Sequence, residues 1–328
     1  MRSIWPRLLG LLLGTTILLG ATAAVAQPSN DGEGVDSQVL WATPGPSNFP
    51  TMQSSDIVGH LGVAFGAVFG YYRESLGLEV TQPDGTTKTK WAVENAVTAD
   101  FMWAFGLAEI FQIGLVLPVV LDQSGVGATP FQPQGVDDSS YKLAGSALRD
   151  LRFNAKTRFV GGNADNPDRR GFGLGLDVGA NIPSGDELNF AGDNGFVVSP
   201  LAIFDYHLCK FSIAANVGAR LRTEKAQLAD LVVGHQFVYG LGITGHYADR
   251  RLLLSAEGGG LVEFDGFDRV GFEYRGAIGY MPDDARAVTI WLSGGSALGT
   301  GDVLGVPQMR VLLGITYAPG PGEEPFEF

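Results

Sequence analysis

The chain has 328 residues, a formal net charge of −13 and 47 glycines, a glycine content well above the usual ~7%. Hydrophobic residues make up 45% of the sequence and charged residues 17%, yet the mean hydropathy is only +0.13. These values exclude a bundle of membrane-spanning helices and a disordered chain. They also argue against a nucleic-acid partner, because phosphate contacts need clustered Lys and Arg.

The first 26 residues predict a secretory signal peptide. Arg2 and Arg7 supply a positive start, residues 8–20 are apolar, and residues 24–26 form a small-residue cleavage site. Loss of these two arginines changes the formal net charge from −13 to −15. The single cysteine, Cys209, excludes an intramolecular disulfide, although an exported chain would meet an oxidising compartment.

From residue 57 onward, hydrophobic side chains alternate with small or polar ones. In the clearest stretch, Leu151, Phe153 and Phe159 share one face, while Arg152 and Lys156 share the other. A period of two predicts β-strands. The whole pattern predicts twelve of them, over residues 57–80, 87–105, 109–121, 148–160, 171–183, 196–207, 209–222, 232–248, 251–264, 269–281, 286–298 and 307–318.

Residues 101–121 allow a competing interpretation, since a run of this length with a single charge could be a transmembrane helix. Pro118 would break that helix, and residues 106–109 are typical of a turn. Residues 110–121 also alternate. We therefore expect two strands here.

Each predicted strand has an apolar face without charge and a polar face that carries charge at mid-strand. Mostly short connections alternate along the chain with longer ones rich in Gly, Pro and Asp, at residues 122–147, 184–195, 223–231 and 299–306. Aromatic residues gather near strand ends, which a soluble β-sandwich could also show. The two-faced strands favour an all-β fold, a transmembrane antiparallel up-and-down β-barrel of about 12 strands.

The expected organisation has four parts. A signal peptide covers residues 1–26, and a periplasmic N-terminal segment covers residues 27–55 as an extended tail or a partial plug. The outer-membrane barrel spans residues 56–319, and a short C-terminal tail covers residues 320–328. The expected location is the outer membrane of a Gram-negative cell.

Two passages resemble known outer-membrane proteins. Residues 145–156 (GSALRDLRFNAK) and 176–186 (LDVGANIPSGD) are similar to the strand-and-turn pattern of barrels in the phenol-degradation meta-pathway transporter group. They are also similar to the N-terminal barrel of OmpA-family proteins from myxobacteria, and residues 114–121, 300–302 and 310–319 extend the match. The resemblance covers most of residues 57–319 and implies an outer-membrane barrel, but its motifs say little about function.

Charged residues on the polar faces are the candidates for a lumen lining. They could offer hydrogen bonds and an electrostatic filter to solutes, or they could form a salt-bridged plug. Barrels of ~8 strands are filled by side chains and those of ~16–18 strands are open, so both interpretations stay possible. The candidates are Glu94, Asp100, Asp150, Arg152, Lys156, Arg158, Asp177, Lys210, Arg220, Glu257, Glu263, Glu273, Arg275 and Arg310.

Evidence for a metal site or an enzyme is weak. Asp186, Glu187 and Asp193 lie in the acidic loop 184–195 and offer oxygen ligands of the kind that Ca²⁺ takes, but without the spacing of a calcium loop. An exposed acidic turn is the alternative. The four histidines are far apart in sequence, and neither G-x-S-x-G nor a P-loop is present, so we expect no enzyme activity and no cofactor.

Two functions fit these features. The first is a passive channel that passes small solutes through a polar lumen. The second is a non-conducting structural or surface-interaction protein, with loops 122–147 and 184–195 available to partners. The expected partners are the lipid bilayer, small-molecule solutes and, through those loops, other surface molecules.

Overall fold

The computed structural model describes residues 34–38, 40–81, 85–131, 142–161, 171–208, 210–228, 231–264, 266–283, 286–298 and 305–319. The predicted signal peptide and the predicted tail at 320–328 therefore lie outside the described residues. Within the described ranges, no helix has the length and apolar character needed to cross a membrane.

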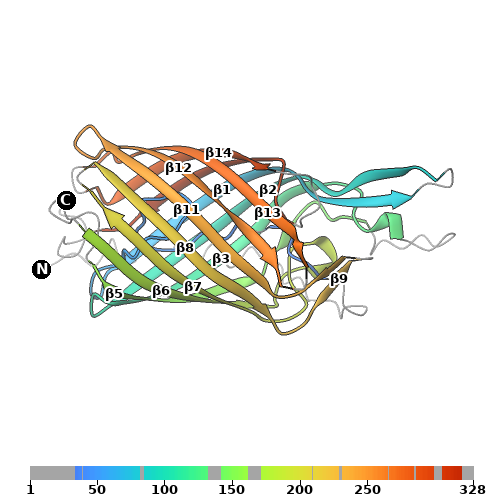
Figure 1. The fold of residues 1–328 in the computed structure, drawn as a ribbon, viewed down its shortest axis with the longest axis horizontal. Coiled ribbons are helices and arrows are strands. Elements are labelled where there is room, and N and C mark those ends of the chain that lie inside the picture. The colour runs from blue at the N-terminus through green and yellow to red at the C-terminus, as the bar shows by residue number, and fades with distance from the viewer. Residues whose placement is uncertain are drawn as a thin grey trace, which may run out of the picture.

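Twelve strands of the described residues form a closed antiparallel barrel (Figure 1). Each strand pairs with its neighbours in chain order, and β1 pairs with β15 to close the ring, with Phe65 opposite Tyr317 and Arg73 opposite Met309. The strands are β1 (Val63–Thr81), β2 (Thr87–Leu107), β3 (Phe111–Ser124), β5 (Leu151–Val160), β6 (Gly171–Ile182), β7 (Val197–His207), β8 (Phe211–Arg222), β11 (Gln236–Tyr247), β12 (Leu252–Glu263), β13 (Gly266–Tyr280), β14 (Val288–Leu298) and β15 (Met309–Tyr317).

Minor elements lie at one end of the barrel. The two-residue strand β4 (Ala147–Leu148) pairs with β3, and β9 (Ala226–Leu228) pairs with β10 (Leu231–Val233) as a separate small hairpin. The β1–β2 hairpin also projects past its neighbours there, to the right in Figure 1. We call this the loop end, because it carries the longer connections β3–β5, β6–β7, β8–β11 and β14–β15. The opposite end carries the β2–β3, β7–β8 and β11–β12 turns, and we call it the turn end.

The strand predictions are confirmed in number and in approximate position. The hairpin of β2 and β3 replaces the helix considered for residues 101–121, and its turn places Ala108 and Glu109 at φ of 53° and 58°. The first strand begins at Val63 rather than at residue 57. Ile57 continues the apolar odd positions of β1, but it and Val58 are buried inside the barrel and are not part of the sheet.

Strand β15 shows how the sequence period becomes two surfaces. Val311, Leu313 and Ile315 face outward and are exposed, whereas Arg310 and Leu312 face inward and are buried. Because successive side chains of a strand point to opposite sides, the same alternation around the ring gives an apolar outer surface and a polar interior. A soluble domain would show the reverse distribution of apolar and charged side chains.

The described residues between 34 and 58 lie inside the barrel, as a plug would, rather than outside it as an extended tail; both forms were expected for the segment at 27–55. The described part of this segment enters at the loop end, where the Ser37 backbone N–H donates to the Phe190 carbonyl, and leaves at the turn end, where Leu61 donates to Gly106. None of its described residues pairs as a strand with the wall. Its polar side chains and backbone groups suit the polar interior, whereas the outer surface offers them no partner. We call residues 34–58 the lumen segment.

Candidate functional site

Most of the predicted lumen residues lie inside the barrel, where their side chains meet one another and the lumen segment. The buried members are Asp100, Asp150, Arg152, Lys156, Asp177, Arg220, Glu257, Glu263, Glu273, Arg275 and Arg310. They are brought together because every second residue of a strand faces the interior, and paired residues on neighbouring strands face the same side.

Three of the predicted residues lie elsewhere. Glu94 is exposed because it lies just beyond the last β2–β3 pair, Asn95 with Ser124, in the hairpin that projects from the barrel. Lys210 is exposed in the connection between β7 and β8. Arg158 is half-buried at the turn end, where its guanidinium donates to the Glu109 carbonyl at 2.6 Å. Alternation alone could not show where the projecting hairpin or the turn begins.

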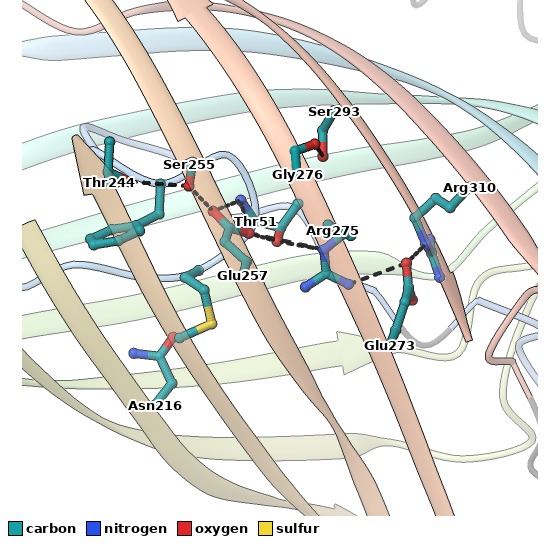
Figure 2. Close-up of polar contacts among 12 residues, drawn as sticks. Thr51, Asn216, Thr244, Ser255, Glu257, Glu273, Arg275, Gly276, Ser293 and Arg310 are labelled. Carbon is teal, nitrogen blue, oxygen red and sulfur yellow. Dashed lines mark hydrogen bonds and ion pairs between the residues drawn. The ribbon is translucent and has the colours of Figure 1, made fainter. Parts of the chain in front are cut away.

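A ladder of ion pairs crosses one side of the wall (Figure 2). Glu273 accepts from Arg310 Nε at 2.6 Å and lies 3.2 Å from Arg275 Nη1. Arg275 stands directly opposite Glu257 in the β12–β13 register, with 3.9 Å between Nε and Oε2. Gly295 on β14 stands between Arg275 and Arg310, and a Cβ there would lie 2.5 Å from the Arg275 Cγ. The same Cβ would also clash with the Tyr274 backbone carbonyl, so a larger residue at position 295 would disturb both the β13 backbone and the Arg275 side chain.

Thr51 of the lumen segment joins this ladder (Figure 2). Its hydroxyl donates to Glu257 and accepts from Arg275 Nε at 3.0 Å, while its backbone N–H donates to the same Glu257 carboxylate at 3.2 Å. The ladder thus holds the lumen segment as well as three strands of the wall.

Gln53 fixes the lumen segment to the opposite wall. Its side-chain amide donates to Asp177 at 2.8 Å, and its backbone N–H and carbonyl bond to the Asn216 side chain, both at 2.9 Å. Gly240 on β11 leaves room for Met52, since a Cβ there would lie 2.6 Å from the Met52 sulfur. The lumen segment is therefore held by side-chain contacts rather than by a β-ladder.

A second ion-pair cluster closes the loop end. Arg149 Nη2 lies 2.7 Å from Asp36 of the lumen segment, and Arg149 Nη1 lies 3.5 Å from Asp100, which also pairs with Arg152 at 3.4 Å. Burial opposes the charged form of Arg149, but the nearby Asp36 and Asp100 outweigh it and raise the pKa of its guanidinium. Arg149 was not among the predicted lumen residues, because it lies before β5 and does not fall on the polar face of the alternating pattern.

Asp150 organises the adjoining loop between β6 and β7. Its carboxylate accepts from the backbone N–H groups of Ser184, Gly185 and Asp193 at 2.9–3.1 Å. Burial raises the pKa of Asp150 to about 7, although the N–H donors from Asp193 and Gly185 favour the ionised form. Asp150 therefore folds the loop inward and is not free to line a pathway.

The acidic residues considered for calcium do not converge. Asp186 accepts from the Asn189 side chain at 2.7 Å, and Asp193 pairs with Arg222 at 3.2 Å. Within the described ranges, no three His, Cys, Asp or Glu side chains are grouped as a metal site requires. Asp186 thus has a partner inside the loop, whereas the partner of Asp193 is Arg222 on β8.

The turn end holds a chain of polar side chains that sequence spacing did not show. Asp205 and Ser212 bond to the two ring nitrogens of His207, and the Ser212 hydroxyl also meets His246 Nε2, all at 2.9 Å. Ser55 of the lumen segment donates its backbone N–H to Asp205. Two histidines far apart in sequence therefore share one hydroxyl, because β7, β8 and β11 are neighbours. Ser212 itself is 1% exposed, so its hydroxyl is a buried tie between the two histidines.

A cavity of about 160 Å³ remains between the lumen segment and the wall. The lumen segment contributes one side of it and strands of the wall the other, mainly β5–β8 and β11, with residues of β3, β12 and β13 at its margin. Its lining includes Trp41, Met52, Arg152, Asn181, Arg220 and Tyr239. The interior is therefore neither an open pore nor completely filled.

Comparison with known proteins gives a likeness of fold. No family model and no curated protein matches the chain. Among solved structures, the COG4313 outer-membrane channel from Pseudomonas putida F1 matches with a TM-score of 0.57 and 15% identity, over 81% of this chain and 98% of that one. The KdgM and NanC porins each match at 8% identity over 77% of this chain and 98% of theirs, with TM-scores of 0.45 and 0.47, too low to carry an argument. The chain thus has the closed, 12-stranded barrel fold of an outer-membrane channel.

Proposed function

We propose that this protein is an outer-membrane channel for the passive passage of small solutes, exported by its N-terminal signal peptide. The apolar outer surface suits lipid and the charged interior suits water and polar solutes. A solved structure with this fold is an outer-membrane channel, which supports the same interpretation. The finer resemblance to meta-pathway transporter barrels and OmpA-family barrels stays a prediction.

The observation that carries the proposal is how the lumen is occupied. The lumen segment fills much of the interior, yet among its described residues none pairs with a wall strand. Its ties include the Asp36–Arg149 ion pair, the hydrogen bonds of Thr51, Gln53 and Ser55, and two hydrogen bonds between the Gln112 side chain and the segment's backbone. The segment can therefore shift without breaking the backbone hydrogen bonds between the strands of the wall. In this proposal, the structure corresponds to a closed form of the channel.

The filled lumen also favours a second candidate, a non-conducting structural or surface-interaction protein. In that case the ion pairs inside the barrel would serve stability alone. Loops 122–147 and 184–195 would contact partners outside the cell.

Planar-bilayer recording separates the two candidates. We compare the wild-type protein with the double variant Asp36→Asn and Asn216→Ala, which loosens the lumen segment at two points. A channel should open more often or more widely in this variant, because the segment loses an ion pair and a pair of hydrogen bonds.

The matched control is Asp249→Asn with Asn95→Ala, which makes the same chemical changes away from the lumen segment. It should conduct as the wild type does. If the wild-type and loosened barrels are both silent, although both migrate as folded protein, the channel is contradicted and the structural candidate is favoured.

A further inference from the structure

We infer that the cavity between the lumen segment and the wall binds a small carboxylic acid that has a compact apolar body. This inference rests on the proposed channel function, because it names the class of solute that the closed lumen holds. The argument comes from the unpaired polar atoms, the charge and the volume of the cavity.

Several buried polar atoms of the cavity lining have no hydrogen-bond partner. The donors are Arg152 Nη1, Asn181 Nδ2 and Trp41 Nε1, and the acceptors are Gln53 Oε1 and Asn154 Oδ1. Arg152 and Asn181 are 5% and 1% exposed. Because an unpaired buried polar group costs free energy, such a set is expected where a ligand completes it. The three donors need an acceptor such as a carboxylate.

The charge around Trp41 points to an anion. The guanidinium carbons of Arg220 and Arg152 lie 3.6 and 5.6 Å from the centre of the Trp41 ring, so two cations share one indole. Asp100 is the ion-pair partner of Arg152, but it is shared with Arg149. The two carboxylates of the cavity lining have other partners, since Asp177 accepts from Gln53 and Glu273 pairs with Arg275 and Arg310. A carboxylate beside Arg152 would form charge-assisted hydrogen bonds and reduce the repulsion between the two guanidinium groups.

The rest of the cavity sets the size and the polarity of the ligand. Met52, Leu201, Val238 and Tyr239 provide apolar surface. The volume of about 160 Å³ is similar to that of an apolar cavity of roughly 150 Å³ that binds benzene. A body of about one six-membered ring therefore fits, whereas an inorganic anion would leave this apolar surface uncovered.

Isothermal titration calorimetry of the full chain in detergent tests the inference, with cyclohexanecarboxylate as the probe. We expect saturable binding at one site. Cyclohexylmethanol has nearly the same shape without the charge and should not bind. Chloride and acetate should not compete at equal concentration, because they lack the apolar body.

Two variants locate the site. Arg152→Gln removes the charged donor, and Asn181→Leu removes a second donor without reducing volume; each should weaken binding by roughly tenfold or more, as expected for the loss of a charge-assisted or a buried hydrogen bond. Arg251→Gln makes the first change in the β11–β12 turn at the far end of the barrel and should bind as the wild type does. Heat-modifiable migration on gels confirms that each variant is folded.

The outcomes separate this inference from the proposed channel. Absence of saturable binding, equal binding of the alcohol, or full binding by both folded variants would overturn the carboxylate site, whatever the conductance. A barrel that binds the acid but never conducts would overturn the channel and leave the site intact.

Discussion

At the residue scale, the interior depends on buried charged side chains, many of which pair with an opposite charge. Glu273 is the central acid of the ladder, because Arg275 and Arg310 both pair with it. Arg310 is fully buried and otherwise lies over the Tyr72 ring, with 4.4 Å between its guanidinium carbon and the ring centre. A buried charge that loses its partner is costly, whereas replacing a whole pair by apolar groups is often neutral.

This difference predicts an order of stabilities. Glu273→Leu leaves Arg310 without an acid and should lower the free energy of unfolding by about 3–5 kcal/mol. Arg310→Met should cost less, because Glu273 keeps Arg275. The double variant should recover part of the loss. Urea unfolding in lipid vesicles, followed by Trp fluorescence, measures all three; equal small effects in both single variants would show that water screens the ladder.

The residue scale also shows why the site was only partly predictable. Alternation along β13 and β15 identifies Glu273, Arg275 and Arg310 as inward-facing. It cannot identify Arg149 or Trp41, which lie outside the strands, nor the shared hydroxyl of Ser212, which depends on how three strands are paired. Strand period determines the face of a residue but not its partner.

At the element scale, each strand presents one face to the outside, and exposure alone does not say whether lipid or water covers it. Leu292 at the middle of β14 and Ile110 in the β2–β3 turn are 51% and 57% exposed. In a soluble protein an arginine at either position would be nearly neutral. In a membrane barrel the cost depends on depth.

We therefore expect different effects from the same change at these two positions. Leu292→Arg should lower the free energy of unfolding by about 2–4 kcal/mol, and Ile110→Arg by about 0–1 kcal/mol. Equilibrium unfolding in phospholipid vesicles provides the measurement. Equal costs at both positions would contradict a bilayer around the middle of the barrel.

At the scale of the whole molecule, pairing of β1 with β15 removes every free edge from the main sheet. The lumen segment adds cross-links through the interior, from Arg149 at the loop end to Gln112 near the turn end. Such a closed sheet should keep its compact shape in mild detergent at room temperature and lose it only on heating.

The expected result is heat-modifiable migration on gels, with a strand-rich circular dichroism spectrum that changes only in the heated sample. Samples kept cold and samples boiled before electrophoresis are compared directly. A helical spectrum, or the same mobility before and after boiling, would contradict the closed barrel.

The sequence by itself determined the strands, their two faces and their number, because a period of two is a local property that each segment carries independently. Only the tertiary structure decided where the chain leaves the sheet, which charged side chains pair and which segment fills the lumen, because a local pattern contains no information about distant residues. The lumen segment shows the difference most clearly. Ile57 continues the alternation of the first predicted strand, yet it is buried inside the ring that β1 and β15 close. Contacts across a barrel join residues that are distant in sequence, so their partners exist only once the ring has closed.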